Sequence, residues 1–299
     1  MKKVKFLSEG LSLAGNLYRP ANFDATQTYA AVIISGSWTT VKEQMAHLYA
    51  QQFSAMNFAA FTFDHRNFGE SEGLPREYEN PEMKVADIKN AVTYLSALPF
   101  VDTDKISGLG ICAGGAYMIH AAAEDSRIKL VATVAAWLMT PETAKLIYGG
   151  AEGVALRITK ALEAKEVFAE TGKSISVPAY DPNNQEAARY FPVDYYGKSE
   201  RGAVPSWKNN FAVMSWEKWL SYDGVSASKS LSVPVVMIAS EQQFLPTGTK
   251  TAFENFSSDA KAIEWLNDYG HTDFYDDAHA ISEAISLIVD RFHVVLQEV

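Results

Sequence analysis

The sequence predicts an α/β protein with a mostly parallel sheet and helices on both faces. A continuous β-branched run at 30–36 is typical of a strand that is buried on both faces. Apolar runs at 58–64 and 233–240 predict further strands of this kind. Helical patterns lie between the predicted strands, and this alternation is what favours a parallel sheet covered by helices.

The expected elements follow in chain order. Residues 11–20 alternate between apolar and polar side chains, as an edge or half-buried strand does. In addition to the runs above, we expect strands at 105–111, 129–137 and 262–268. We expect helices at 41–56, 84–98, 114–125 and 247–256, and a final helix from about 276 to 296.

The alternation stops between about Leu138 and Ser232. This segment contains a helical pattern at 143–169, a loop-like stretch at 176–185 and a cluster of aromatic residues: Tyr190, Phe191, Tyr195, Tyr196, Trp207, Phe211, Trp216 and Trp219. Because a cluster of aromatic side chains is expected to cover another surface, we interpret residues 138–232 as a helical lid over an active site. Residues 1–137 and 233–299 then form the core. A satellite helical pack without a chemical role is the alternative.

Composition narrows the class of protein. The formal net charge of −10 is spread along the chain and gives no support for nucleic acid as a partner. A single cysteine excludes an internal disulfide framework and is compatible with a reducing compartment. No apolar run follows the basic start, and none approaches roughly 20 residues, so we expect neither a secretory signal nor a membrane span. We therefore expect a cytoplasmic protein.

The single cysteine, Cys112, lies in the stretch GLGICAGGAY, between a predicted strand and a predicted helix. Glycines occupy both second-neighbour positions, Gly110 and Gly114. This pattern is typical of a nucleophile elbow, in which a strained residue projects its side chain clear of the sheet. The following helix would direct its free N–H groups at the sulfur and favour the thiolate. We therefore predict that Cys112 is a nucleophile; a buried packing cysteine is the alternative.

A cysteine nucleophile needs a base, and His271 is the candidate. It follows the last predicted strand, in a loop that should lie at the same sheet edge as the elbow. His279 and His293 fall within the final helix, where a surface or packing role is expected.

A third group normally orients such a histidine. It is expected after the strand 233–240, where an aspartate commonly stands four residues before the proline, but this chain has Gln242 there. We take Glu241 as the acid, with Asp223 and Asp273 as substitutes. Backbone donors should also hold a developing oxyanion. We expect the N–H of Ala113, together with that of Trp38 or Ser37 in the loop after 30–36.

The residues of the elbow, 110–115, resemble those of the α/β-hydrolase superfamily. The likeness is greatest to its dienelactone-hydrolase-like and polyketide-transferase-like branch. It also rests on the helix start at Val41, on DHRNFGESEG from Asp64, and on Gly270-His271. The resemblance implies an α/β-hydrolase fold with an eight-stranded sheet, and an esterase, lactonase, thioesterase or acyltransferase without a metal or organic cofactor. We expect Asp64, His65 and Arg66 to organise their loop.

These observations together predict a hydrolase of carboxylic ester, lactone or thioester bonds that works through an acyl-enzyme on Cys112. The expected partner is a small apolar or aromatic acyl substrate, and a homodimer is one assembly that the sequence leaves open. An acyltransferase of polyketide or natural-product assembly is the first alternative. A catalytically silent scaffold that binds a small ligand is the second. A redox sensor is disfavoured because the chain has no second thiol.

Overall fold

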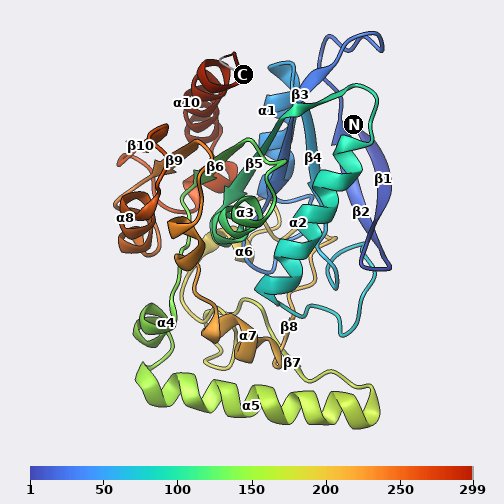
Figure 1. Ribbon diagram of the computed structural model, residues 1–299. Helices are drawn as coiled ribbons and strands as arrows, with labels where there is room; N and C mark the ends of the chain where they lie inside the picture. The colour runs from blue at the N-terminus through green and yellow to red at the C-terminus, as the bar shows by residue number, and fades with distance from the viewer. Residues whose placement is uncertain (298–299) are drawn as a thin grey trace.

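The computed structural model describes residues 1–297 and contains an eight-stranded sheet in the order β1-β2-β4-β3-β5-β6-β9-β10 (Figure 1). The strands are β1 (Lys2–Ser8), β2 (Leu11–Tyr18), β3 (Tyr29–Ser35), β4 (Ala59–Phe63), β5 (Val101–Ile111), β6 (Leu130–Val134), β9 (Val235–Ala239) and β10 (Lys261–Trp265). From β4 to β10 every neighbouring pair is parallel, whereas β1 pairs antiparallel with β2, and β2 with β4. The predicted α/β fold with a mostly parallel sheet is confirmed.

Helices cover both faces of the sheet. On one face α1 (Met45–Ala55) packs on β3 and β4 and against α10 (Ala278–Gln297). On the other face α2 (Pro81–Ser96) and α3 (Ala113–Glu124) pack on each other and on β5. A further helix, α8 (Pro246–Asn255), follows β9. The central strands β3 and β6 lie between these layers, and their apolar side chains are buried, as a strand covered on both faces requires.

The first strand, β1, was not expected from the sequence pattern. Its sequence, KKVKFLS, buries only Phe6 and Ser8, and three lysines occupy most of the outward positions. An edge strand of this kind has too few apolar residues to show a periodic pattern, and its lysines discourage pairing with another chain.

Residues 138–232 connect β6 to β9 and lie at one end of the sheet (Figure 1). They contain α4 (Pro141–Ile147), α5 (Gly150–Thr171), α6 (Asp194–Gly197), α7 (Ser215–Ser221) and the small hairpin of β7 (Ser176–Val177) and β8 (Phe211–Ala212), followed by a 3-10 turn at Ser226–Lys229. The helical pattern at 143–169 is two helices and not one, because Gly149 and Gly150 both have positive φ, 83° and 74°. We call residues 138–232 the insertion; its action as a lid stays a prediction.

The last part of the chain also differs in detail from the expected single helix. A short helix, α9 (Asp273–Asp276), precedes α10, so the expected start near residue 276 coincides with the end of α9. Within the described chain, no helix has the length and apolar character that crossing a membrane requires.

Candidate active site

Cys112 occupies the sharp turn between β5 and α3. Its backbone angles, φ 55° and ψ −124°, lie where side chains other than glycine are rarely found, and α3 starts at the next residue. A Cβ on Gly110 would lie 2.3 Å from the carbonyl oxygen of Gly114, and one on Gly114 would lie 2.4 Å from that of Ser35. Both neighbouring positions therefore require glycine, as the elbow pattern predicts.

Three donors surround the sulfur of Cys112. They are the backbone N–H of Ala113 and the hydroxyls of Ser37 and Tyr275. The residue is only 2% exposed, and this burial raises the pKa of the thiol even though these donors and the charge of Arg189 oppose the rise. In this arrangement the sulfur is protonated at neutral pH.

His271 lies in the loop after β10 and is buried beside the elbow. Its Nε2 is 2.9 Å from the hydroxyl oxygen of Tyr275, and its Nδ1 accepts the backbone N–H of Phe244 at 3.1 Å. Burial, assisted by the positive charge of Arg189, lowers the pKa of His271 to about 3. The imidazole is therefore neutral.

These contacts decide which nitrogen of His271 carries the proton. Because the N–H of Phe244 points at Nδ1, that nitrogen presents its lone pair and the ring proton lies on Nε2. Nε2 then donates to Tyr275, whose hydroxyl also lies 3.2 Å from Oγ of Ser37 and beside the sulfur of Cys112. The Tyr275 hydroxyl thus contacts both the sulfur of Cys112 and the imidazole of His271.

The structure does not bring Glu241 to His271. The loop after β9 turns the Glu241 side chain outward, where it is half exposed and pairs with Lys250 of α8 at 2.7 Å. Gln243 takes the inward direction in its place and donates to the carbonyl of Ala136 at 3.0 Å. The sequence interpretation of Glu241 as the partner of His271 therefore does not describe this arrangement, in which a backbone N–H occupies Nδ1.

The two substitute acids are occupied elsewhere. Asp223 accepts the backbone N–H groups of Val225 and Ser226, which fixes its own turn. Asp273 accepts the N–H of Gly270 at 2.7 Å. Neither carboxylate bonds to the imidazole in this structure.

The loop after β3 lies across the elbow. Trp38 is fully buried, and its ring stacks on Trp219 of the insertion with a centroid separation of 4.9 Å. The Ser37 hydroxyl lies 3.0 Å from that of Tyr196, also of the insertion. The predicted oxyanion donors, Ala113 and this loop, thus lie on the same side as the sulfur; their donation to a substrate stays a prediction.

Two residues at this site, Tyr275 and Arg189, were not expected from the sequence. Tyr275 lies in α9, four residues after His271, which precedes that helix. Arg189 directly precedes the aromatic cluster, and its Nη2 donates to the carbonyl of Trp38 at 2.7 Å and to the Thr39 hydroxyl at 2.9 Å. A lone tyrosine or arginine gives no motif, so only the fold reveals them.

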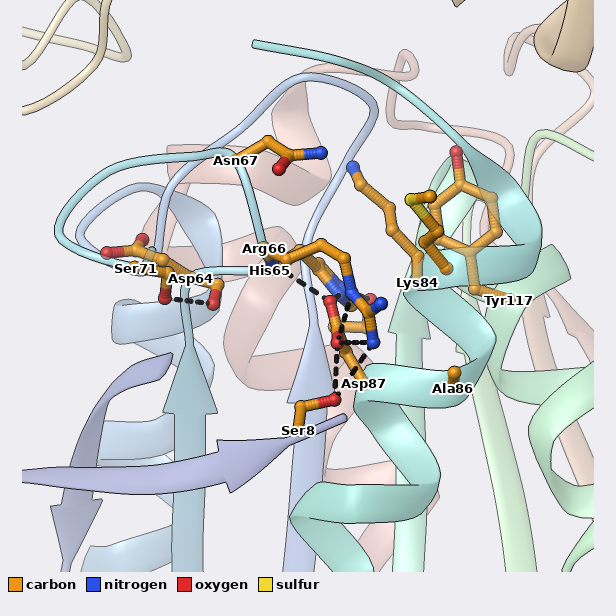
Figure 2. Close-up of polar contacts among 12 residues, drawn as sticks. Ser8, Asp64, His65, Arg66, Asn67, Ser71, Lys84, Ala86, Asp87 and Tyr117 are labelled. Carbon is orange, nitrogen blue, oxygen red and sulfur yellow. Dashed lines mark hydrogen bonds and ion pairs between the residues drawn. The ribbon is translucent and has the colours of Figure 1, made fainter. Parts of the chain in front are cut away.

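His65 and Arg66 form a buried network around Asp87 of α2, and Asp64 lies apart from it, next to Ser71 (Figure 2). Arg66 donates to Asp87 through Nε at 2.8 Å and Nη2 at 2.7 Å, and His65 lies 3.6 Å from the second carboxylate oxygen. Asp64 binds the ammonium of Lys42 at 2.7 Å. These contacts tie the loop after β4 to α2 and to the segment before α1, which supports the organising role expected from the sequence.

An apolar pocket of ≈ 300 Å³ lies beside the elbow. It is lined by core residues Trp137, Phe244 and Leu245 and by insertion residues Ile147 and Phe191. The N–H of Trp137 donates to the carbonyl of Cys112 at 2.9 Å, and the ring of Phe244 lies 4.3 Å from that of His271. The pocket therefore shares its walls with the site.

Comparison with protein families gives a match to the family described as "Alpha/beta hydrolase family" over residues 31–284. This match covers most of the chain and includes the elbow, the insertion and the loop of His271. The chain belongs to the alpha/beta hydrolase family. The predicted α/β-hydrolase fold and the resemblance stated from the elbow are confirmed.

Relatives within this hydrolase family refine the likeness. The chain is 26% identical to Thiohydrolase aneE of Aspergillus aculeatus, over 90% of this chain and 86% of that protein. It is 37% identical to Polyketide transferase claH of Penicillium crustosum over 44% of this chain and 43% of that protein. The crystal structure of hypothetical protein PA2218 from Pseudomonas aeruginosa, 27% identical, superposes with a TM-score of 0.85 and covers 98% of this chain and 92% of that one.

Proposed function

We propose that this α/β hydrolase cleaves carboxylic ester, lactone or thioester bonds through an acyl-enzyme on Cys112. The observation that carries the proposal is the strained backbone of Cys112 at the start of α3, with the Tyr275 hydroxyl linking its sulfur to His271. A structural cysteine has no need of a disfavoured φ, whereas a nucleophile must stand clear of its strand. The names of the relatives, thiohydrolase and polyketide transferase, support acyl chemistry.

The reaction has two steps. The sulfur of Cys112 attacks the acyl carbon while its proton passes, by way of the Tyr275 hydroxyl, to His271. The carbonyl oxygen becomes an oxyanion held by the N–H groups of Ala113 and of Trp38 or Ser37. The C–O or C–S bond to the leaving group then breaks, and His271 returns the proton to the departing alcohol or thiol. Water, deprotonated by His271, then attacks the acyl carbon. The C–S bond to Cys112 breaks, the carboxylic acid leaves, and His271 returns the proton to the sulfur.

Proton transfer to Nε2 of His271 requires a different tautomer from the one described above. Nδ1 must exchange the Phe244 N–H for an acceptor, so that Nε2 presents its lone pair. Glu241 lies on the same loop as Phe244, three residues earlier. We propose that the reactive arrangement turns this loop and gives Nδ1–H to the Glu241 carboxylate.

The substrate class follows from the surroundings of the sulfur. Because Cys112 is 2% exposed, the substrate reaches it only when the insertion shifts away from the loop after β3. The adjoining pocket is apolar and aromatic, which favours an acyl or alcohol part of similar character. A thiolate nucleophile suits thioesters and activated esters, whose leaving groups need little assistance.

The direct test is a panel of aryl esters, lactones and acyl thioesters with the wild type, Cys112→Ala and His271→Ala. We expect turnover by the wild type, loss of turnover in both variants, and a mass increase equal to the acyl group on the peptide containing Cys112. Circular dichroism and melting curves establish that the variants are folded. Full activity in either folded variant would rule out this mechanism.

Acyl transfer is the second candidate, because a dry site protects an acyl-enzyme from water. The burial of both Cys112 and His271 favours it. Adding an alcohol or amine to the acyl-enzyme distinguishes the two reactions: an acylated product formed faster than the free acid supports transfer. A silent ligand-binding scaffold is the outcome if a thiol-directed probe labels Cys112 no faster than free cysteine.

A further inference from the structure

Arg189 carries a buried positive charge without a carboxylate partner among the described residues. The residue is 2% exposed, and its guanidinium lies between two aromatic rings, 4.7 Å from the centroid of Trp38 and 3.9 Å from that of Tyr196. A guanidinium stays charged at any pH the protein meets. Buried charges are normally paired, because the loss of hydration is costly.

The hydrogen bonds of Arg189 are also incomplete. Nη2 donates to the carbonyl of Trp38 and to the hydroxyl of Thr39, both of them neutral acceptors. Nη1 is buried and has no hydrogen-bond partner. The two N–H groups of Nη1 are thus left free inside the protein, next to an uncompensated charge. A buried cation with unpaired N–H donors is typical of an anion-binding group without its ligand.

The acid that approaches this region is already neutralised. Glu79 accepts the N–H of Thr39 at 3.0 Å, and the same oxygen accepts the ammonium of Lys84 at 2.8 Å. Its second oxygen accepts the hydroxyl of Tyr117 at 2.7 Å. Glu79 and Lys84 therefore form a closed pair, and the charge of Arg189 remains in excess.

Arg189 stands next to the proposed reaction centre. The hydroxyl of Tyr196, over whose ring the guanidinium lies, is 3.0 Å from Oγ of Ser37, and Ser37 in turn hydrogen-bonds the sulfur of Cys112. Two residues after Arg189, Phe191 lines the apolar pocket. An acyl chain bound at Cys112 would thus have the guanidinium within reach of its far end.

We propose that Arg189 binds a carboxylate at the far end of the acyl group, so that the preferred substrates are esters or thioesters of dicarboxylic acids. The proposal rests on the proposed function, since it assigns the specificity of the same site. Nη1 supplies the donors, and the ring of Tyr196, which belongs to the insertion as Arg189 does, keeps the guanidinium in place. Because Arg189 belongs to the insertion, the donors become accessible in the same movement that uncovers Cys112.

The kinetic test uses two matched series of N-acetylcysteamine thioesters. One series is glutaryl, adipyl and pimelyl; the other replaces the terminal carboxylate by an isopropyl group of the same shape. At one chain length or more, the wild type should prefer the carboxylate by about tenfold or more in kcat/KM, and Arg189→Met should abolish this preference. Arg189→Lys should retain part of this preference, because lysine keeps the positive charge but lacks the planar set of guanidinium N–H donors.

Arg157→Met is the matched control. Arg157 also belongs to the insertion and also lies over two rings, those of Tyr148 and Trp216, but its Nη1 already donates to two backbone carbonyls. Its replacement should leave the preference ratio as it is in the wild type. Equal kcat/KM for both series in the wild type overturns the proposal. An equal loss for both series in Arg189→Met does so too, since it would mean that Arg189 only fixes the Trp38 loop.

A binding measurement separates this proposal from the proposed function. At constant ionic strength, adipate should raise the melting temperature of the wild type more than hexanoate does, and the difference should vanish in Arg189→Met. If no thioester is turned over, the proposed function fails, and adipate binding that depends on Arg189 still supports the anion site. Absence of that binding overturns it.

Discussion

The hydroxyl of Tyr275 lies 2.9 Å from Nε2 of His271 and also hydrogen-bonds the sulfur of Cys112. A direct nucleophile–base contact is thereby replaced by a contact through a phenol. Burial raises the pKa of Tyr275 well above its ordinary value, so the group is a neutral hydroxyl. Such a hydroxyl can accept the thiol proton while it gives its own to the imidazole, without ever carrying a charge.

Tyr275→Phe tests this role. We expect the rate of acylation of Cys112 to fall about 100-fold, because general acid–base assistance of this size is lost, while KM changes little. Stopped-flow measurement of the first turnover of an aryl ester gives the acylation rate. Tyr18→Phe is the control, since it removes a buried phenol that bonds Nδ1 of another histidine, His47, at 2.6 Å. An acylation rate equal to that of the control would show that the phenol is not on the proton path.

The lowered pKa of His271 predicts how stability depends on pH. The folded-state pKa is about 3, whereas an unfolded histidine titrates near 6.5. Between these values the unfolded state binds more protons, so the free energy of unfolding falls as pH falls, by up to about 1.4 kcal/mol per pH unit. Urea unfolding at pH 7, 6, 5 and 4 should therefore show a shallower slope for His271→Gln than for the wild type.

His65 provides the comparison for that experiment. Burial also lowers its pKa, and it is present in both proteins, so its contribution cancels in the difference. Identical slopes for the wild type and His271→Gln would mean that His271 is solvated and titrates normally.

Glu241 and Lys250 form a pair whose two halves can be tested separately. Both side chains are about half exposed, so breaking the pair should change stability by less than about 1 kcal/mol. Glu241→Gln and Lys250→Gln each break it, but only the first removes the carboxylate proposed for Nδ1 of His271. We expect kcat to fall at least tenfold in Glu241→Gln and to stay at the wild-type level in Lys250→Gln. Equal kcat in the two variants would exclude Glu241 as the orienting acid.

The fold and the sharp turn at Cys112 were predictable because their signals are local. Buried strands show as apolar runs, and the elbow shows as glycines at fixed spacing around Cys112. The direction of the Glu241 side chain was not predictable. A carboxylate two residues after the end of β9 can face inward or outward, and this loop turns it towards Lys250. Tyr275 and Arg189 have their roles through contacts between segments far apart in the chain, about which spacing says nothing.

Gly114→Ala tests how tightly the elbow is packed. The added methyl group would lie 2.4 Å from the backbone carbonyl oxygen of Ser35, which cannot move without shifting β3. We expect a loss of about 2–3 kcal/mol in the free energy of unfolding, together with loss of activity because Cys112 is displaced. Chemical denaturation measures the first and aryl-ester turnover the second. Wild-type stability would contradict the close approach of α3 to the loop after β3.

Asp87→Asn tests whether the network of Figure 2 is structural. The carboxylate is fully buried. It accepts two hydrogen bonds from the Arg66 guanidinium, one from the Arg66 backbone N–H and one from the Ser8 hydroxyl. Removing its charge leaves the Arg66 guanidinium without its buried partner, and we expect a loss of about 3 kcal/mol or more in the free energy of unfolding. Asp125→Asn, which breaks a more exposed pair with Arg127, should cost less than about 1 kcal/mol. Equal losses in the two variants, or lost turnover at wild-type stability in Asp87→Asn, would instead place these residues in the chemistry.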